Sequence, residues 1–183
     1  MLWLRVIVES FATIVVALAR VLSGRAARGT VALKPGDPAP AFALAGSDGR
    51  VHRLSDYRSS AVVLVWFPRA FTGGCTVQCR ALARDAQAWR RFAAQVFAVS
   101  VDTPERAASF ARAIGLEVPV LSDPTGDVAR QYGVMGLAGF PHRWTFYIGA
   151  DGRILDIDRA VVPSTHGADI AQRLKALGVP QSA

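Results

Sequence analysis

The sequence predicts an α/β fold in which a mixed β-sheet is flanked by helices. The chain has 183 residues, of which 51% are hydrophobic and 19% are charged, as expected of a globular domain with a sizeable core. From Pro40 onward, segments typical of strands and helices alternate in the order β-α-β-α, and a β-hairpin and a last helix follow. This alternation favours a sheet of parallel and antiparallel strands with helices packed on it.

The first half of this predicted domain contains a hairpin, a buried strand and a long helix. The turn signal SDGR, residues 47–50, separates two short strand-like segments and predicts a hairpin. Residues 61–67, AVVLVWF, form an apolar run rich in β-branched residues, which is typical of a strand buried on both faces. In the next segment, apolar residues are spaced four, three, four, three and four residues apart, which predicts one helix with a single buried stripe. The stripe consists of Cys75, Cys79, Leu82, Ala86, Trp89 and Ala93.

The second half alternates short strands with helices. Thr103 precedes a proline-led amphipathic segment and is the predicted N-cap of a helix. The dipeptide Asp151-Gly152 separates two strand-like segments and predicts a second hairpin. The expected strands are residues 96–101, residues 118–121 and the two arms of the hairpin within 144–158. The expected helices are residues 104–114, a short helix within 123–134, and residues 167–177.

Residues 1–34 are predicted to form an N-terminal apolar or amphipathic helix and a linker, outside a domain of residues 35–183. Residues 2–22 are apolar apart from a few polar positions that lie close to one helical face. The longest uncharged stretch, Ser10 to Ala19, is shorter than the roughly 20 residues that a membrane-spanning helix needs. Three interpretations stay open: a helix lying in a membrane interface, a spanning anchor, and a cleaved signal peptide.

The basic charge is concentrated at the N-terminus. The net charge is +7, and residues 1–34 carry five basic residues and one acidic residue, or +4 of that total. The rest of the chain has no compact basic patch with interleaved aromatic residues, which argues against a nucleic-acid partner. The basic N-terminus favours an anionic membrane surface instead. We therefore expect a membrane-associated protein whose catalytic domain lies in the cytoplasm, the side that the basic residues after the apolar segment favour if that segment spans the membrane. A soluble cytoplasmic protein and an exported protein stay open as alternatives.

Both cysteines of the chain lie in the stretch FPRAFTGGCTVQC, residues 67–79. Two cysteines four residues apart can be a metal site, a disulfide, a nucleophile with its helper, or two small apolar fillers. Cys75 follows a strand and the Gly73-Gly74 pair, and it opens a helix, where the dipole and the unpaired N–H groups favour a thiolate. Cys75 is therefore the predicted nucleophile. Cys79, one turn deeper on the same face, is equally compatible with packing.

This region resembles the active-site signature of the peroxiredoxin (AhpC/TSA-like) family. Pro68, Thr72 and Cys75 form the pattern P-x-x-x-T-x-x-C directly after an apolar strand. The segments KPGDPAPAFAL and LSDPTGDVARQYGV resemble the family's opening and middle, and HRWTFYIGADGRILDI resembles the hairpin that carries its active-site arginine, here Arg143. The resemblance covers approximately residues 31–177 and is greatest to the PrxQ, or bacterioferritin-comigratory, type. It implies a thioredoxin-like fold.

The resemblance implies a thiol-dependent peroxidase that reduces hydrogen peroxide and organic hydroperoxides. Cys75 would attack the peroxide and become a sulfenic acid, Thr72 would hydrogen-bond to the peroxide, and Arg143 would stabilise the developing negative charge. Pro68 would shape the loop and shield the sulfenate. The resemblance implies no metal or organic cofactor, and it implies thioredoxin or a similar dithiol as the reductant.

Cys79 is the candidate resolving cysteine, which would form a disulfide with the oxidised nucleophile. In proteins of the PrxQ type this cysteine usually lies five residues after the nucleophile, whereas Cys79 lies four residues after Cys75. The departure leaves core packing open as an alternative role for Cys79.

The alternative function is a Sco-like Cu(I)-binding chaperone or a thiol–disulfide oxidoreductase on the same fold. Sco-type proteins also use C-x-x-x-C with a distant histidine, thiolates suit Cu(I), and three histidines are available. They are His52, His142 and His166. The prolines usual beside the Sco cysteines are missing, and so is the C-x-x-C of disulfide reductases. Thr72 and Arg143 fit peroxide chemistry, which makes the peroxidase the preferred prediction.

Overall fold

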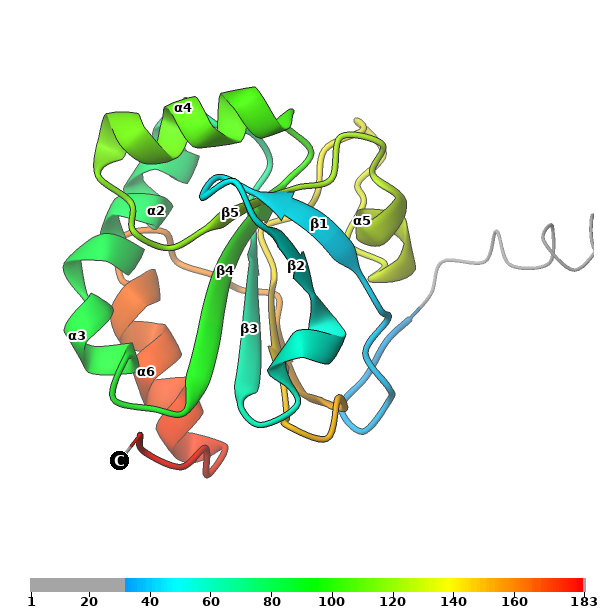
Figure 1. The fold of residues 1–183 in the computed structure, drawn as a ribbon, viewed down its shortest axis with the longest axis vertical. Helices are drawn as coiled ribbons and strands as arrows, with labels where there is room; N and C mark the ends of the chain where they lie inside the picture. The colour runs from blue at the N-terminus through cyan, green and yellow to red at the C-terminus, as the bar shows by residue number, and fades with distance from the viewer. Residues whose placement is uncertain (1–31, 183) are drawn as a thin grey trace, which may run out of the picture. The chain divides into compact units, whose positions relative to one another are not determined.

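The computed structural model describes residues 32–182, so the helix predicted over residues 2–22 lies outside the described residues. Seven strands of the described part form one mixed sheet in the order β2-β1-β5-β4-β3-β6-β7 (Figure 1). The central strands β3, β4 and β5 are parallel, and the flanking pairs run antiparallel to their neighbours. The strands are β1 (Ala43–Gly46), β2 (Val51–Arg53), β3 (Ala61–Trp66), β4 (Ala94–Ser100), β5 (Val120–Ser122), β6 (Thr145–Ile148) and β7 (Ile154–Asp158).

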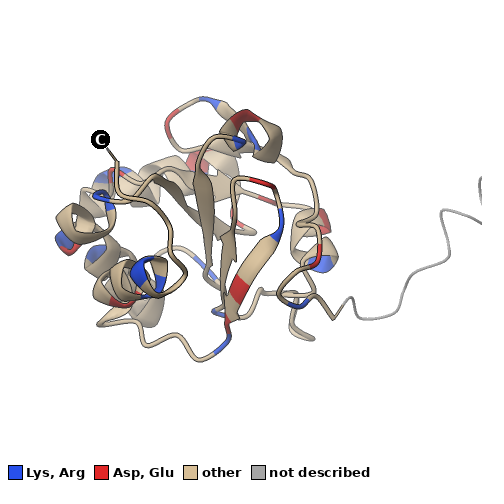
Figure 2. Cartoon of the chain, turned by 90° about the horizontal axis from the view of Figure 1, so that it is seen from below, with Lys and Arg blue, Asp and Glu red and all other residues tan. Residues whose placement is uncertain are grey.

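Helices pack on both faces of the sheet. They bury all six residues of β3, as its continuous apolar run predicts. Val63 and Val65 pack in a cluster with residues of α2, α3, α4 and α6. Val62 and Leu64 point to the opposite face and pack with residues of α5. The α-helices are α2 (Gly73–Arg84), α3 (Ala86–Trp89), α4 (Pro104–Ile114), α5 (Asp127–Gln131) and α6 (His166–Ala176), and a 3-10 helix, η1, spans Leu54–Tyr57. Charged residues of both signs lie mainly on helices and loops around the sheet (Figure 2).

Local sequence signals predicted most of these elements. Both hairpins form, β1 with β2 and β6 with β7, and Gly152 adopts the positive φ of +78° that its turn requires. Thr103 caps α4 as expected, because its hydroxyl accepts a hydrogen bond from the backbone N–H of Arg106 (3.4 Å).

The prediction of one long helix carrying the cysteine stripe is wrong. The chain leaves the helical conformation at Asp85 (φ −97°, ψ 15°), so α2 ends at Arg84 and the short α3 begins at Ala86. The Asp85 carboxylate accepts two hydrogen bonds from Arg84 (2.8 and 2.7 Å), and Gly167 in the first turn of α6 lies so close that a Cβ atom there would stand 2.7 Å from Asp85 Cβ. These contacts hold Asp85 beside the start of α6 and favour a break over continuation.

Among residues 32–182, no helix is both long and apolar enough to cross a membrane. The longest, α2, has 12 residues, whereas a spanning helix needs roughly 20. The membrane-associated localisation expected from the sequence is therefore corrected: no element of the described residues supports it. The segment on which it depended, residues 2–22, lies outside the described part of the chain.

Candidate active site

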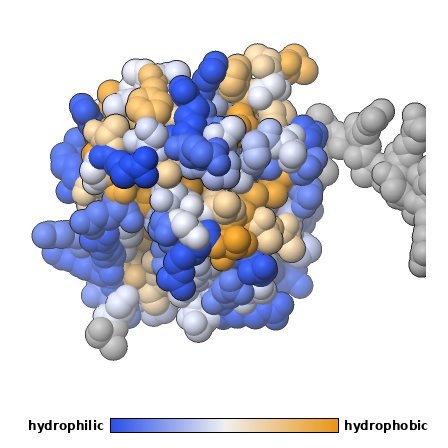
Figure 3. All heavy atoms as spheres, turned by 45° about the horizontal axis from the view of Figure 1, so that its top comes forward, coloured by the Kyte–Doolittle hydropathy of each residue, from blue (hydrophilic) through white to orange (hydrophobic). Residues whose placement is uncertain are grey.

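The predicted site residues follow β3 or precede β6, whose first residue pairs with Val65 near the end of β3. This edge of the sheet, where β3 and β4 end, lies below α4 in Figure 1. A loop of residues 68–72 leads from the end of β3 into α2, and Pro68 is its half-buried first residue. The same edge of the molecule is turned forward in Figure 3, where hydrophobic residues are exposed between hydrophilic ones. Loops that follow parallel strands at this edge are common places for functional side chains.

The loop before α2 is held by a buried carboxylate that the sequence analysis did not identify. Asp102 follows β4, and its carboxylate accepts hydrogen bonds from the backbone N–H of Ala70 (2.7 Å), the Ser100 hydroxyl (2.9 Å) and Arg106 Nε (2.9 Å). Arg106 also donates to the backbone carbonyl of Ala70 (2.9 Å), so both backbone groups of Ala70 are bonded. These contacts tie the loop to β4 and α4.

The contacts of Asp102 and Arg106 with this loop support an unfavourable backbone conformation at Phe71. Phe71 has a φ of +66° and is the one non-glycine residue with positive φ among residues 32–182. Such a conformation persists when surrounding contacts hold it. Arg106 lies 5.1 Å above the centre of the Phe71 ring, and Phe110 contacts the ring edge-on. The fixed conformation of the loop therefore sets the direction in which α2 begins.

Cys75 lies in the first turn of α2, and its residue surface is only 1% exposed. Arg143 Nη2 donates a hydrogen bond to Cys75 Sγ at 3.5 Å. The positive end of the helix dipole and the guanidinium act on the same atom, and both stabilise negative charge on the sulfur. The structure thus brings together two residues 68 positions apart in sequence.

Arg143 lies two residues before β6 and reaches across to α2. Its Nη1 atom donates to the backbone carbonyl of Gly74 (3.5 Å) and to the side-chain oxygen of Gln78. A Cβ atom at Gly74 would stand 3.2 Å from Arg143 Nη2, so glycine at this position leaves room for the guanidinium beside the helix. The arginine is therefore anchored to the same helix that carries Cys75.

Thr72 occupies the N-cap position of α2 and is exposed. Its hydroxyl donates to the backbone carbonyl of Arg69 (3.0 Å), which leaves the lone pairs of the hydroxyl oxygen able to accept from another donor. Thr72 and Pro68 therefore frame the loop that Cys75 follows.

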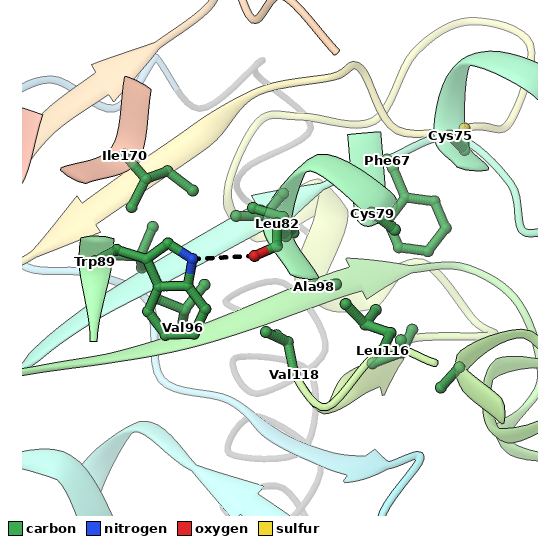
Figure 4. Packing of buried hydrophobic residues seen from close by; sticks show 14 of the residues in the cluster. Phe67, Cys75, Cys79, Leu82, Trp89, Val96, Ala98, Leu116, Val118 and Ile170 are labelled. Carbon is green, nitrogen blue, oxygen red and sulfur yellow. Dashed lines mark hydrogen bonds between the residues drawn. The ribbon is translucent and has the colours of Figure 1, made fainter. Parts of the chain in front are cut away.

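Cys79 lies one turn further along α2 and is fully buried beside Phe67 and Leu82 in the core cluster (Figure 4). Both cysteines are free thiols. Burial and the neighbouring Cys75 raise the pKa of Cys79, while Arg143 opposes this effect. Residues four apart in a helix have Cβ atoms roughly 5–6 Å apart, beyond the approximately 3.5–4.5 Å of a disulfide. The folded helix therefore keeps Cys79 protonated and out of bonding range.

Three buried polar residues lie behind Arg143, and the sequence analysis named only one of them, His166, as a histidine available to copper. Gln78 Nε2 bonds to His166 Nδ1 (3.0 Å), and His166 Nε2 bonds to Thr145 Oγ1 (2.8 Å). All three residues are completely buried. One signal was visible beforehand, because Gln78 lies three residues after Cys75 and so belongs to the inward face of the helix, where an amide needs a partner.

The burial of His166 predicts a pH-dependent stability. Burial lowers its pKa from 6.5 to about 4, with Asp169 opposing and Arg143 reinforcing the shift. The unfolded chain therefore takes up this proton first as the pH falls, so the free energy of unfolding decreases between pH 6.5 and 4. The loss from this group should reach about 3 kcal/mol. Denaturant unfolding of the wild type and of His166→Asn across this range should show a steeper decline in the wild type, and parallel curves would refute the assignment.

The other two histidines lie in different environments. His52 is bonded to Asp48 (3.1 Å) and to the Tyr57 hydroxyl, and the exposed His142 stacks on Trp144. Within residues 32–182, no group of three or more histidine, cysteine, aspartate or glutamate side chains is placed to hold a metal ion. The structure therefore gives the predicted copper alternative no assembled ligand set in this range.

Comparison with known proteins places this geometry in a family. The sequence profile of the AhpC/TSA family matches residues 35–157. Peroxiredoxin Bcp of Escherichia coli (strain K12) is 34% identical over 150 residues, which cover 78% of this chain and 96% of that protein.

Solved structures agree with the sequence comparison. The crystal structure of peroxidoxin BcpB from Mycobacterium tuberculosis superposes with a TM-score of 0.71 at 33% identity, over 79% of this chain and 97% of that one. A mutant of PrxQ from Xylella fastidiosa gives a TM-score of 0.72 at 25% identity, over 80% and 98% of the two chains. The fold is accordingly the thioredoxin-like α/β fold that the resemblance implied. The chain belongs to the AhpC/TSA family, as a peroxiredoxin of the Bcp, or PrxQ, type.

Proposed function

We propose that Cys75 is the nucleophile with which this thiol-dependent peroxidase reduces hydrogen peroxide and organic hydroperoxides. The observation that carries the proposal is the hydrogen bond from Arg143 Nη2 to Cys75 Sγ (3.5 Å) at the first turn of α2. A cation and a helix N-terminus aimed at one buried sulfur fit an activated thiolate. The peroxiredoxin relatives support the activity itself, and they give no support to a copper chaperone.

In the proposed reaction the Cys75 thiolate attacks one oxygen of the peroxide. The sulfur–oxygen bond forms as the oxygen–oxygen bond breaks, and Cys75 becomes a sulfenic acid. The leaving oxygen departs as hydroxide or alkoxide and takes up a proton, giving water or an alcohol. Arg143 stabilises the negative charge on that oxygen, Thr72 hydrogen-bonds to the peroxide, and Pro68 shields the sulfenic acid from solvent.

Cys79 is the proposed resolving residue. Its sulfur attacks the sulfenic sulfur of Cys75, a disulfide forms, and water leaves. A dithiol of the thioredoxin kind then reduces the disulfide by exchange. The first turn of α2 must unwind for the two sulfurs to meet, and Gly73-Gly74 at its start make that end easy to open.

Peroxide consumption tests the proposed function directly. The purified protein should accelerate the loss of hydrogen peroxide and of cumene hydroperoxide in the presence of dithiothreitol, and thioredoxin with its reductase should replace dithiothreitol. A rate equal to that of the reductant alone would contradict the proposal. Parallel titration with Cu(I) tests the alternative, for which tight stoichiometric binding without peroxide turnover is the expected result.

The Cys79→Ser variant separates the resolving step from the attack. It should consume the first equivalent of peroxide at the wild-type rate and then accumulate sulfinic acid at Cys75, since no second thiol traps the sulfenic acid. Mass spectrometry after one and ten equivalents of peroxide measures both species. Wild-type protein should give the Cys75–Cys79 disulfide under the same conditions. A persistent sulfenic acid or a Cys75–Cys75 bond between two chains would instead make Cys79 a core residue in a one-cysteine cycle.

The division of the chain at residue 34 belongs to the same proposal. We assign the catalytic domain to residues 35–183, and the family match beginning at residue 35 supports this boundary. The side chains assigned to peroxide chemistry all lie within it.

A further inference from the structure

We propose that His166 and Thr145 are positioning residues that orient the Gln78 amide and, through it, hold the Arg143 guanidinium at Cys75. The inference rests on the proposed role of Arg143 in peroxide reduction. It concerns the hydrogen-bonded chain Cys75–Arg143–Gln78–His166–Thr145, whose five members come from α2, α6, β6 and the loop before β6.

The hydrogen bonds of this chain run in one direction only. A guanidinium can only donate, so the Gln78 side-chain oxygen must face Arg143. The NH₂ group of the amide then faces His166 Nδ1, which must be an unprotonated acceptor. The proton of the neutral imidazole therefore lies on Nε2, where it is donated to Thr145 Oγ1.

Reversing any one group places two donors against each other. A flipped Gln78 amide would point its NH₂ group at the guanidinium, and a proton on His166 Nδ1 would point at the amide NH₂ group. Gln78, His166 and Thr145 are completely buried, so water does not compensate for such a mismatch. The burial that lowers the pKa of His166 keeps its ring neutral at pH 7, and this series of hydrogen bonds requires a neutral ring.

The position of the guanidinium depends on this orientation. Gln78 lies about one helical turn from Cys75 on the same helix. A guanidinium that is bonded to Gln78 is therefore held beside the Cys75 sulfur. Thr145 follows Arg143 by two residues and is the first residue of β6. The last hydrogen bond of the series is therefore made to the strand that follows the arginine. Loss of the acceptor at His166 frees the amide to rotate and removes one of the anchors that hold Arg143.

Three variants test the proposal by stopped-flow measurement of Cys75 oxidation by hydrogen peroxide. His166→Leu removes the acceptor and should slow the reaction at least roughly tenfold, since a displacement of about 1 Å can cost about a hundredfold. His166→Asn places an oxygen near the position of Nδ1 and should stay within about twofold of the wild type. His52→Leu is the matched control, because it removes another buried, hydrogen-bonded histidine, on β2, and should lower stability without changing the rate.

A double-mutant cycle with Arg143→Met distinguishes positioning from a general structural effect. If His166 acts through Arg143, His166→Leu should have no further effect on the rate in the Arg143→Met background. A tenfold loss that persists there overturns this inference alone. An Arg143→Met variant as fast as the wild type overturns both the proposed role of Arg143 and the inference built on it.

The tautomer of His166 provides a test that does not depend on activity or on a variant that folds. Long-range ¹H–¹⁵N correlation spectra of the wild-type protein at pH 7 should show His166 as a neutral ring protonated at Nε2. A ring protonated at Nδ1, or at both nitrogens, would overturn the proposed direction of the hydrogen bonds.

Discussion

Replacing Cys75 with serine is expected to abolish peroxide turnover. A serine hydroxyl is a far weaker acid and nucleophile than a cysteine thiol, so the attacking anion is lost. Cys79 cannot take its place, since it is fully buried and its pKa is raised by that burial. Turnover should fall by at least about a thousandfold, in line with the removal of an enzyme's nucleophile.

The measurement is steady-state loss of hydrogen peroxide with dithiothreitol as reductant. Circular dichroism should confirm that Cys75→Ser retains the wild-type fold, because the substitution barely changes the volume of the side chain. Cys79→Ser is the matched control, since it removes the other thiol of the same helix and should keep the first turnover. Substantial turnover by Cys75→Ser would show that the nucleophile lies elsewhere.

The second large effect is expected for Arg143→Met. Methionine approximates the length of the arginine stem but removes the charge that faces both the sulfur and the leaving oxygen. The second-order rate constant for Cys75 oxidation should fall about 100-fold to 1,000-fold, comparable to the loss of one preorganised donor at a developing charge. The disulfide-forming step of the proposed cycle should change little, because in that step Cys79 attacks a neutral sulfenic acid.

Two further arginine variants sharpen this prediction. Arg143→Lys keeps one positive charge but loses the planar fork that reaches Cys75, Gly74 and Gln78 together, so an intermediate rate is expected. Arg153→Met removes the same net charge from the turn between β6 and β7, where Arg153 bonds to the Gly36 carbonyl, and should react like the wild type. Equal rates for Arg143→Met and Arg153→Met would remove Arg143 from the mechanism.

Local sequence patterns were sufficient for most of the secondary structure. The apolar run of β3, the turn residues of both hairpins and the Thr103 cap of α4 act through neighbours within a few residues. Such interactions can be read from short windows of sequence. The break at Asp85 could not, because it lies where α6 packs closely on the end of α2: a Cβ atom on Gly167, 82 positions away, would stand 2.7 Å from Asp85 Cβ.

The candidate site likewise contains one residue that its own segment identifies and one that it does not. Cys75 could be singled out from its own segment, since a glycine pair and a helix start lie directly before it. Arg143 could not be chosen from spacing or composition among 19 arginines, and it was identified by its resemblance to the arginine-bearing hairpin of peroxiredoxins. The contact to Cys75 Sγ at 3.5 Å spans 68 residues and exists only because β6 pairs with β3.

The sequence by itself determined the strands and most helices, the placement of Cys75 at a helix N-terminus, and the family. It determined these because hydrophobic periodicity, turn chemistry and a spaced signature are properties of neighbouring residues. Only the tertiary structure decided that Gln78, His166 and Thr145 form one buried chain behind Arg143. The physical reason is that a buried polar group must be bonded, but any part of the chain that the fold brings within about 3 Å can supply the partner.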